Sequence, residues 1–189
     1  MRGKGWWLVG FAAFGVLMAL LGLATGSVNI PVREVWHSLF QAGNGTYDVI
    51  ILQVRLPGII TAIAAGAGLA AAGLLMQTIF LNPLAGPGVL GLTGGASLGV
   101  ALVMLAQPLW AMTPLPQELL ITLAALAGAI AVLLLITFAD RRVGDGITLL
   151  ILGLMVGYLS AALVTVLQAS SEARALKGFV VWGMGSFAG

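Results

Sequence analysis

The sequence predicts an all-α protein, a polytopic bundle of five transmembrane helices. Of its 189 residues, 60% are hydrophobic and only 7% are charged, whereas a soluble domain carries about 25% charged residues. Five apolar stretches contain no Asp, Glu, Lys, Arg or His and approach the ~20 residues that a membrane-spanning helix needs. No alternating ten-residue pattern indicates a barrel, so helices are left to satisfy the backbone in lipid.

The expected spans cover residues 6–25, 56–80, 89–106, 119–139 and 147–168 of one transmembrane domain, 1–189. Pro83 and Pro87 separate the second span from the third, because proline interrupts a helix. The polar run 140–146 separates the fourth span from the fifth.

The long connection after the first span contains a further helical pattern. Apolar residues recur there at helical spacing: Val32, Val35, Trp36, Leu39 and Phe40. This pattern predicts an external amphipathic segment at about 32–41 that lies on the membrane surface. An ordinary packed loop helix explains the spacing equally well.

The orientation rests on the basic residues around the first span. Arg2 and Lys4 directly precede it, which favours a cytoplasmic N-terminus. A cleaved signal peptide is the alternative, although the apolar run is longer than the 7–15 residues usual for one.

Glycine predicts close helix packing. Glycines stand four residues apart in the third span (Gly91, Gly95, Gly99) and in the fifth (Gly153, Gly157), and the second span contains Gly66 and Gly73. Small residues at this spacing let helix backbones approach each other in lipid. Packing within the chain is one reading, and a sliding or subunit interface is the other.

Several chemistries are disfavoured. The chain has no cysteine, one histidine (His37) and no glycine-rich loop ending in Gly-Lys-Ser/Thr, so we expect no catalytic residues, metal or cofactor. A net charge of +2 gives no reason to expect nucleic acid as a partner. The expected spans hold no ionisable residue that could bind or relay a coupling ion, so energy for moving a solute would have to come from a partner.

A family resemblance follows from four motifs. Arg55-Leu56-Pro57, the glycine- and alanine-rich run 66–77, Asn82-Pro83-Leu84-Ala85 and Pro87–Gly91 together resemble the FecCD-type permeases. These are membrane subunits of ATP-binding-cassette (ABC) importers for iron-siderophores, haem and vitamin B12. Leu149–Gly153 and Trp182–Ser186 are similar to the family's fifth span and the segment after it.

The resemblance implies a location in the bacterial or archaeal plasma (inner) membrane and a set of partners. These are a second permease subunit in a homo- or heterodimer, a cytoplasmic ATPase and an external substrate-binding protein. Arg55 matches the first arginine of the family's docking segment, but Gly58 replaces the second. A membrane-interface anchor for the second span is an equally good reading of Arg55.

Two turns are candidate sites, a gate region that the resemblance implies and a hinge that the prolines predict. The cytoplasmic gate region falls on Asp145, Gly146, Ile147 and Thr148, whose residue types match the family poorly. Asn82, Pro83 and Pro87 form the hinge between the second and third spans.

Family permeases have about ten spans in two inverted halves, so the resemblance is to the N-terminal half only. We therefore expect the chain not to transport alone. Two other classes of function stay open, a secondary transporter or channel without an ATPase and a membrane scaffold protein. The small or neutral side chains expected along the path, such as Gln77, Thr93, Ser97 and Ser160, do not identify the substrate.

Overall fold

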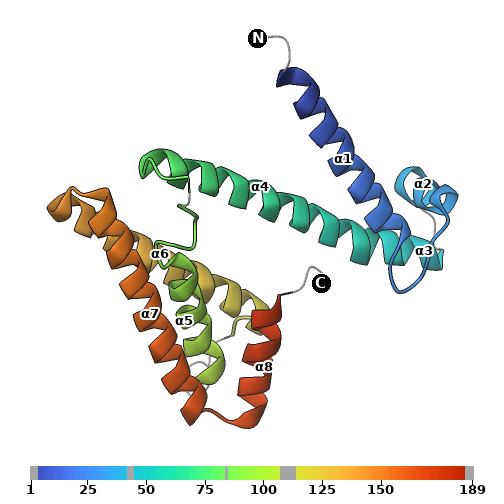
Figure 1. Ribbon diagram of the computed structural model, residues 1–189. Coiled ribbons are helices and arrows are strands. Elements are labelled where there is room, and N and C mark those ends of the chain that lie inside the picture. The colour runs from blue at the N-terminus through green and yellow to red at the C-terminus, as the bar shows by residue number, and fades with distance from the viewer. Residues whose placement is uncertain (1–3, 42–44, 84, 107–113, 186–189) are drawn as a thin grey trace. The chain divides into compact units, whose positions relative to one another are not determined.

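The computed structural model describes residues 4–41, 45–83, 85–106 and 114–185, and the regular structure in these ranges is helical (Figure 1). The predicted all-α class is confirmed. Arg2, Leu84 and Ser186, together with the side chain of Lys4, lie outside the described residues.

The chain forms two compact units, which divide within one long helix. The first unit extends to Gly68, and the second comprises Leu69–Gly185. Helix α4 (Leu56–Ile79) contributes residues to both units.

The first unit joins the ends of two apolar helices through a connection of short helical segments. It contains α1 (Lys4–Ala24), α2 (Val32–Phe40), α3 (Thr46–Val49), a π-helical segment η1 (Ile50–Arg55) and the start of α4. Its core contains one buried residue each from α1, the following loop, α2 and η1: Leu23, Ile30, Val35 and Ile51. The core therefore fixes the connection against the ends of both long helices.

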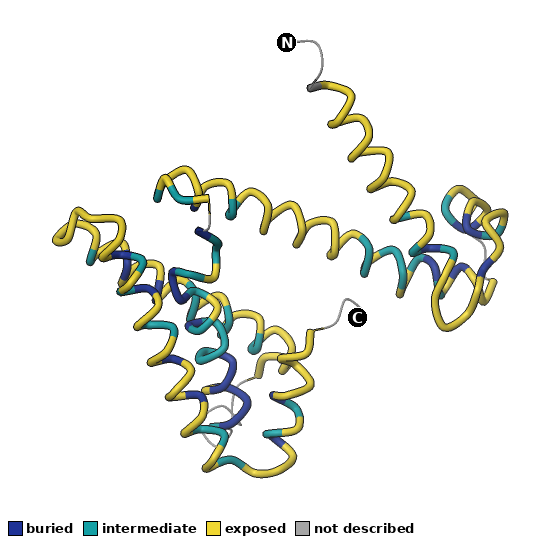
Figure 2. Tube along the Cα trace, viewed as in Figure 1, coloured by how far each residue is buried: buried dark blue, intermediate teal, exposed yellow. Residues whose placement is uncertain are grey.

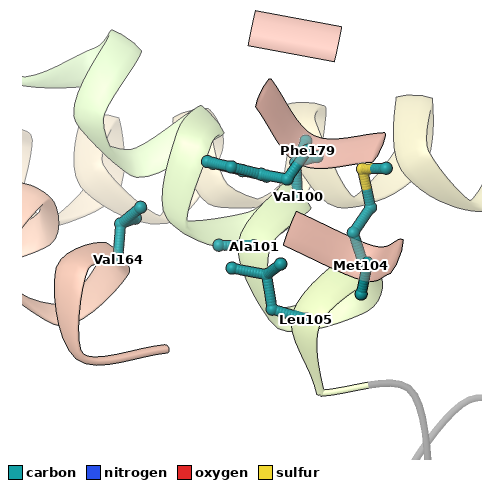
Figure 3. Packing of buried hydrophobic residues seen from close by; sticks show 7 residues of the cluster. Val100, Ala101, Met104, Leu105, Val164 and Phe179 are labelled. Atoms are coloured by element: carbon teal, nitrogen blue, oxygen red, sulfur yellow. The ribbon is translucent and has the colours of Figure 1, made fainter. Parts of the chain in front are cut away.

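The second unit is built around α5 (Leu92–Leu105). Three helices surround it, α6 (Gln117–Val143), α7 (Gly146–Ser170) and α8 (Ala173–Met184) (Figure 1). Val100 and Ala101 of α5 are fully buried and pack with Val164 of α7 and Phe179 of α8 (Figure 3). Buried residues are concentrated along α5, whereas α6 and α7 are mostly exposed (Figure 2).

Four described helices are long and apolar enough to cross a membrane: Gly5–Ala24, Thr46–Ile79, Gln117–Val143 and Gly146–Ser170. The third expected span, residues 89–106, contains only the 14-residue α5. Such a helix is about 21 Å long, which is shorter than the ~30 Å hydrocarbon core. It begins late because Gly91 is in the left-handed conformation (φ +73°), which ends the preceding turn.

Two other elements differ from the sequence expectation. The helical run of the second span begins at Thr46 rather than near Leu56, because α3 and η1 continue directly into α4. Helix α8 was not expected from the sequence. It is only 12 residues long, and its apolar residues Ala175 and Phe179 are buried against α5.

Helix α4 ends with a leucine in a position that usually holds glycine. Leu81 has φ +47° and is the one non-glycine residue with positive φ among the described residues. The Asn82 N–H donates to the Gln77 carbonyl across six residues, as in a Schellman C-cap. Gly144 occupies the matching left-handed position after α6, with its N–H bonded to the Asp140 carbonyl.

These two caps predict opposite effects on stability. Leu81→Gly should raise the free energy of unfolding by about 1 kcal/mol, because glycine adopts the left-handed conformation without a Cβ clash. Gly144→Ala should lower the free energy of unfolding by about 1 kcal/mol, because alanine adopts the left-handed conformation less readily than glycine. The added Cβ would meet no atom within 4 Å, so no steric overlap with a neighbour adds to this cost. Denaturant unfolding in detergent measures both changes, and shifts of the same sign would contradict the account.

Candidate functional site

Backbone-to-backbone contact joins α5 to α6. A Cβ placed on Gly99 would lie 2.1 Å from the Ala124 carbonyl oxygen, and one on Gly95 would lie 2.6 Å from the Gly128 carbonyl oxygen. A Cβ on Gly128 would lie 2.1 Å from the Gly95 carbonyl oxygen. No side chain can replace hydrogen at these positions without moving a helix.

A second glycine contact joins the start of α5 to α7. A Cβ on Gly91 would lie 2.5 Å from the Gly153 carbonyl oxygen, and one on Gly94 would lie 3.1 Å from the Gly157 Cα. Gly91 therefore needs to be glycine on two grounds, its positive φ and this contact. The predicted stripe of Gly91, Gly95 and Gly99 is divided between two partners, because Gly91 faces α7 and the other two face α6.

The glycines of α4 differ from those of α5. A Cβ on Gly66 or Gly73 would meet no atom within 4 Å. The structure therefore gives these two glycines no close contact, in contrast to the glycines around α5.

The predicted hinge is a series of turns between α4 and α5. The Ala85 N–H donates to the Asn82 carbonyl across Pro83, and the Val89 N–H donates to the Gly86 carbonyl across Pro87. Two apolar residues of this connection, Ala85 and Leu90, are buried among α4, α6 and α7. The connection is thus packed against its own unit on both sides of Pro87.

The predicted gate residues form the N-terminus of α7. Asp145 is the N-cap, and its Oδ2 accepts hydrogen bonds from the Thr148 N–H (3.0 Å) and the Thr148 hydroxyl (2.6 Å). These bonds lower the pKa of the Asp145 carboxyl, so it is ionised at neutral pH. A negative N-cap also matches the positive end of the helix dipole.

Asn82 of the predicted hinge and three of the four predicted gate residues line one cleft, which we call the hinge cleft. Its volume is about 410 Å³, and its walls are Ile79–Asn82 on one side and Asp145, Gly146, Ile147 and Leu150 on the other. The Phe80 ring lies 3.4 Å from the position of a Cβ on Gly146. Leu81 is 91% exposed, so the wall combines a carboxylate with exposed apolar side chains.

A second cleft, the hydroxyl cleft, opens between α5, α7 and α8. Its volume is about 450 Å³, and it is lined by Thr93, Gly94, Ser97, Ala161, Val164, Thr165, Phe179, Trp182 and Gly183. Three hydroxyl groups line it, and the rings of Phe179 and Trp182 lie 5.9 Å apart on α8. Of the residues expected along the path, Thr93 and Ser97 line this cleft, Ser160 is buried beside it, and Gln77 is exposed on α4.

Arg55 belongs to the first unit and bonds to the backbone. Its guanidinium donates to the Leu23 carbonyl at 2.6 Å and to the Val28 carbonyl. It also lies against Gly26, whose added Cβ would be 2.9 Å from a guanidinium nitrogen. The side chain therefore ties the end of α1 and the following loop to the start of α4.

The described residues hold no group of three or more His, Cys, Asp or Glu side chains that could bind a metal ion. Four helices long and apolar enough to cross a membrane, together with the glycine contacts around α5, define a polytopic helical membrane protein.

Comparisons with known proteins narrow this class. The chain matches the FecCD transport family over residues 14–189. The vitamin B12 import system permease protein BtuC of Vibrio parahaemolyticus is 36% identical over 175 residues, covering 92% of this chain and 51% of BtuC. The hemin transport system permease protein HmuU of Yersinia pestis is 33% identical over 182 residues, covering 95% of this chain and 53% of HmuU.

A solved structure agrees with the sequence comparisons. It is described as an inward-facing conformation of a metal-chelate type ABC transporter, and it matches with a TM-score of 0.74 at 30% identity over 96% of this chain and 52% of that one. The chain belongs to the FecCD transport family, a family of ABC transporter permease subunits, as the motifs predicted. It spans about half the length of the curated relatives it matches.

Three features of these sites were missed in the sequence. The contact at Gly128 could have been predicted, because the small residues Ala124 and Gly128 stand four residues apart in the fourth span. Thr165 had only a weak sequence signal, since an isolated threonine in a span usually bonds its own helix, as this one does to the Ala161 carbonyl. No sequence signal indicated the aromatic wall formed by Phe179 and Trp182, because α8 itself was not expected.

The glycine contacts predict a position-specific cost of adding one methyl group. Gly99→Ala should lower the free energy of unfolding by about 1–3 kcal/mol, because the Cβ overlaps the Ala124 carbonyl and α5 must move away. Gly73→Ala is the matched control and should be neutral or stabilising by up to about 1 kcal/mol, because alanine favours helix and meets no neighbour. Thermal unfolding in detergent measures both, and equal effects would contradict the packing account.

Proposed function

We propose that the chain forms part of the translocation path of an ABC importer for iron-siderophore, haem or cobalamin-type chelates. The family match over residues 14–189 carries this proposal. Relatives named for vitamin B12 import and hemin transport support the substrate class. The proposed partners are a second permease subunit, a cytoplasmic ATPase that hydrolyses ATP, and an external substrate-binding protein.

The chemistry of the hydroxyl cleft suits a bulky chelate. Three neutral hydroxyl groups and two aromatic rings line it, so it offers hydrogen bonds and apolar area without a charge that would hold a ligand tightly. We place the translocation path along this cleft and along α7. The hinge cleft, with Asp145–Thr148 and the Asn82–Pro87 turns, is the proposed cytoplasmic gate, which requires a cytoplasmic N-terminus.

We expect transport to need the half of the relatives' length that this chain does not match, as well as the partners. Proteoliposomes containing this chain, the cognate ATPase and the binding protein should take up substrate only when a chain carrying the remaining spans is added. Uptake driven by ATP with the short chain alone would contradict the half-permease proposal. Uptake driven by an ion gradient without ATP would instead favour a secondary transporter, and a partner complex without flux would favour a scaffold.

Arg55 is the proposed docking residue for the binding protein. Two of its N–H groups bond to the carbonyls of Leu23 and Val28, and a guanidinium has five donors in all. Docking would therefore use the remaining donors, with the backbone bonds holding the side chain in place.

Two substitutions distinguish the effect of the Arg55 charge from the effect of its two hydrogen bonds to the backbone. Arg55→Lys keeps the charge but cannot bond both carbonyls, so it should lower the free energy of unfolding by about 1–3 kcal/mol, as should Arg55→Ala. If the charge also docks the binding protein, its affinity should fall further with alanine than with lysine. Exposed Arg174→Ala is the control, and equal affinities for all variants would exclude docking at Arg55.

A further inference from the structure

Helix α2 has an exposed apolar stripe as well as a buried one. Val35 is 3% exposed and Ser38 is 1% exposed, on the side that packs into the core of the first unit. Val32, Trp36 and Phe40 are 73%, 65% and 66% exposed. This second stripe is not used to hold the helix to its own unit.

The two stripes are adjacent around the helix. At about 100° per residue, the residues Val35, Leu39, Val32, Trp36 and Phe40 follow one another over an arc of roughly 140°. Arg33 and His37, both exposed, come next after Phe40. The helix surface therefore changes in order from packed apolar to exposed apolar to basic.

Backbone bonds hold α2 at the end of a membrane-spanning helix. The Ile30 N–H donates to the Ala24 carbonyl at the end of α1, and Pro31 precedes the first turn of α2. Arg55 bonds the Leu23 and Val28 carbonyls from the start of α4. Since α1 and α4 enter the bilayer from here, α2 is fixed near the level at which the hydrocarbon ends.

The residue types of the exposed stripe suit the boundary between the lipid hydrocarbon and water. The rings of Trp36 and Phe40 lie 4.4 Å apart and form one aromatic surface. Tryptophan is enriched at the boundary between lipid and water, and a basic flank next to an apolar face is the pattern of helices that lie in the membrane interface. Leu20 and Leu21, near the end of α1 in the same unit, are also exposed, at 47% and 45%.

We propose that α2 is an interfacial anchor whose partner is the lipid bilayer. Val32, Trp36 and Phe40 contact the outer part of the acyl chains, and Arg33 lies at the level of the lipid phosphates. The anchor fixes the rotation and depth of α1 and of the start of α4. This proposal does not depend on transport or on any substrate.

The absence of cysteine from the chain allows a direct test. Single variants Trp36→Cys, Phe40→Cys and His37→Cys are spin-labelled in the full chain and reconstituted into vesicles of phosphatidylethanolamine and phosphatidylglycerol. Collision rates are measured with oxygen, which concentrates in lipid, and with nickel ethylenediaminediacetate, which stays in water. Ile63→Cys, at an exposed position of α4, is the lipid-facing control.

Labels at positions 36 and 40 should resemble the Ile63→Cys control, with oxygen collisions several-fold more frequent than nickel collisions. The label at position 37 should show the reverse order. Frequent nickel collisions at 36 and 40 would show that the stripe faces water and would overturn the proposal. Labels at 36 and 40 that are immobile and protected from both reagents would show that a protein covers the stripe, which would also overturn it.

Discussion

The contact of the α5 backbone with two neighbouring helices is the constraint on which the second unit depends. Membrane helices gain little from burying apolar side chains against each other, because lipid is equally apolar, so close approach of backbones has to supply the attraction. Gly95, Gly99 and Gly128 provide it toward α6, and Gly91 and Gly153 toward α7. The short α5 is thereby held against the two longer helices α6 and α7.

The long spans could be predicted because their signal is local. Charge-free length found α1, α4, α6 and α7 within a few residues. The limits of α5 could not be found in this way, because α5 begins after Gly91, which has a positive φ and lies against Gly153, and charge-free length indicates neither. The hydrogen bonds of Arg55 could not be predicted either, because they go to the carbonyls of Val28 and Leu23, which lie 27 and 32 positions earlier in the chain.

Helix α7 connects the two clefts of the second unit. Its first turn lines the hinge cleft, and Ala161, Val164 and Thr165 line the hydroxyl cleft. Between these ends it touches the α5 side through Gly153 and Gly157. Because the same helix lines both clefts, a movement of α7 along this contact would alter both clefts together.

The π-helical segment Ile50–Arg55 has a consequence for how the sequence can change. Its wider turn, marked by the Leu56 N–H bond to the Ile51 carbonyl, accommodates one residue more than an α-helix would over the same length. If all six residues were wound as an ordinary α-helix instead, everything before them would rotate by about 100° relative to α4. The fully buried Ile51 would then leave its core, so the wide turn is as constrained as the identity of the residues that form it.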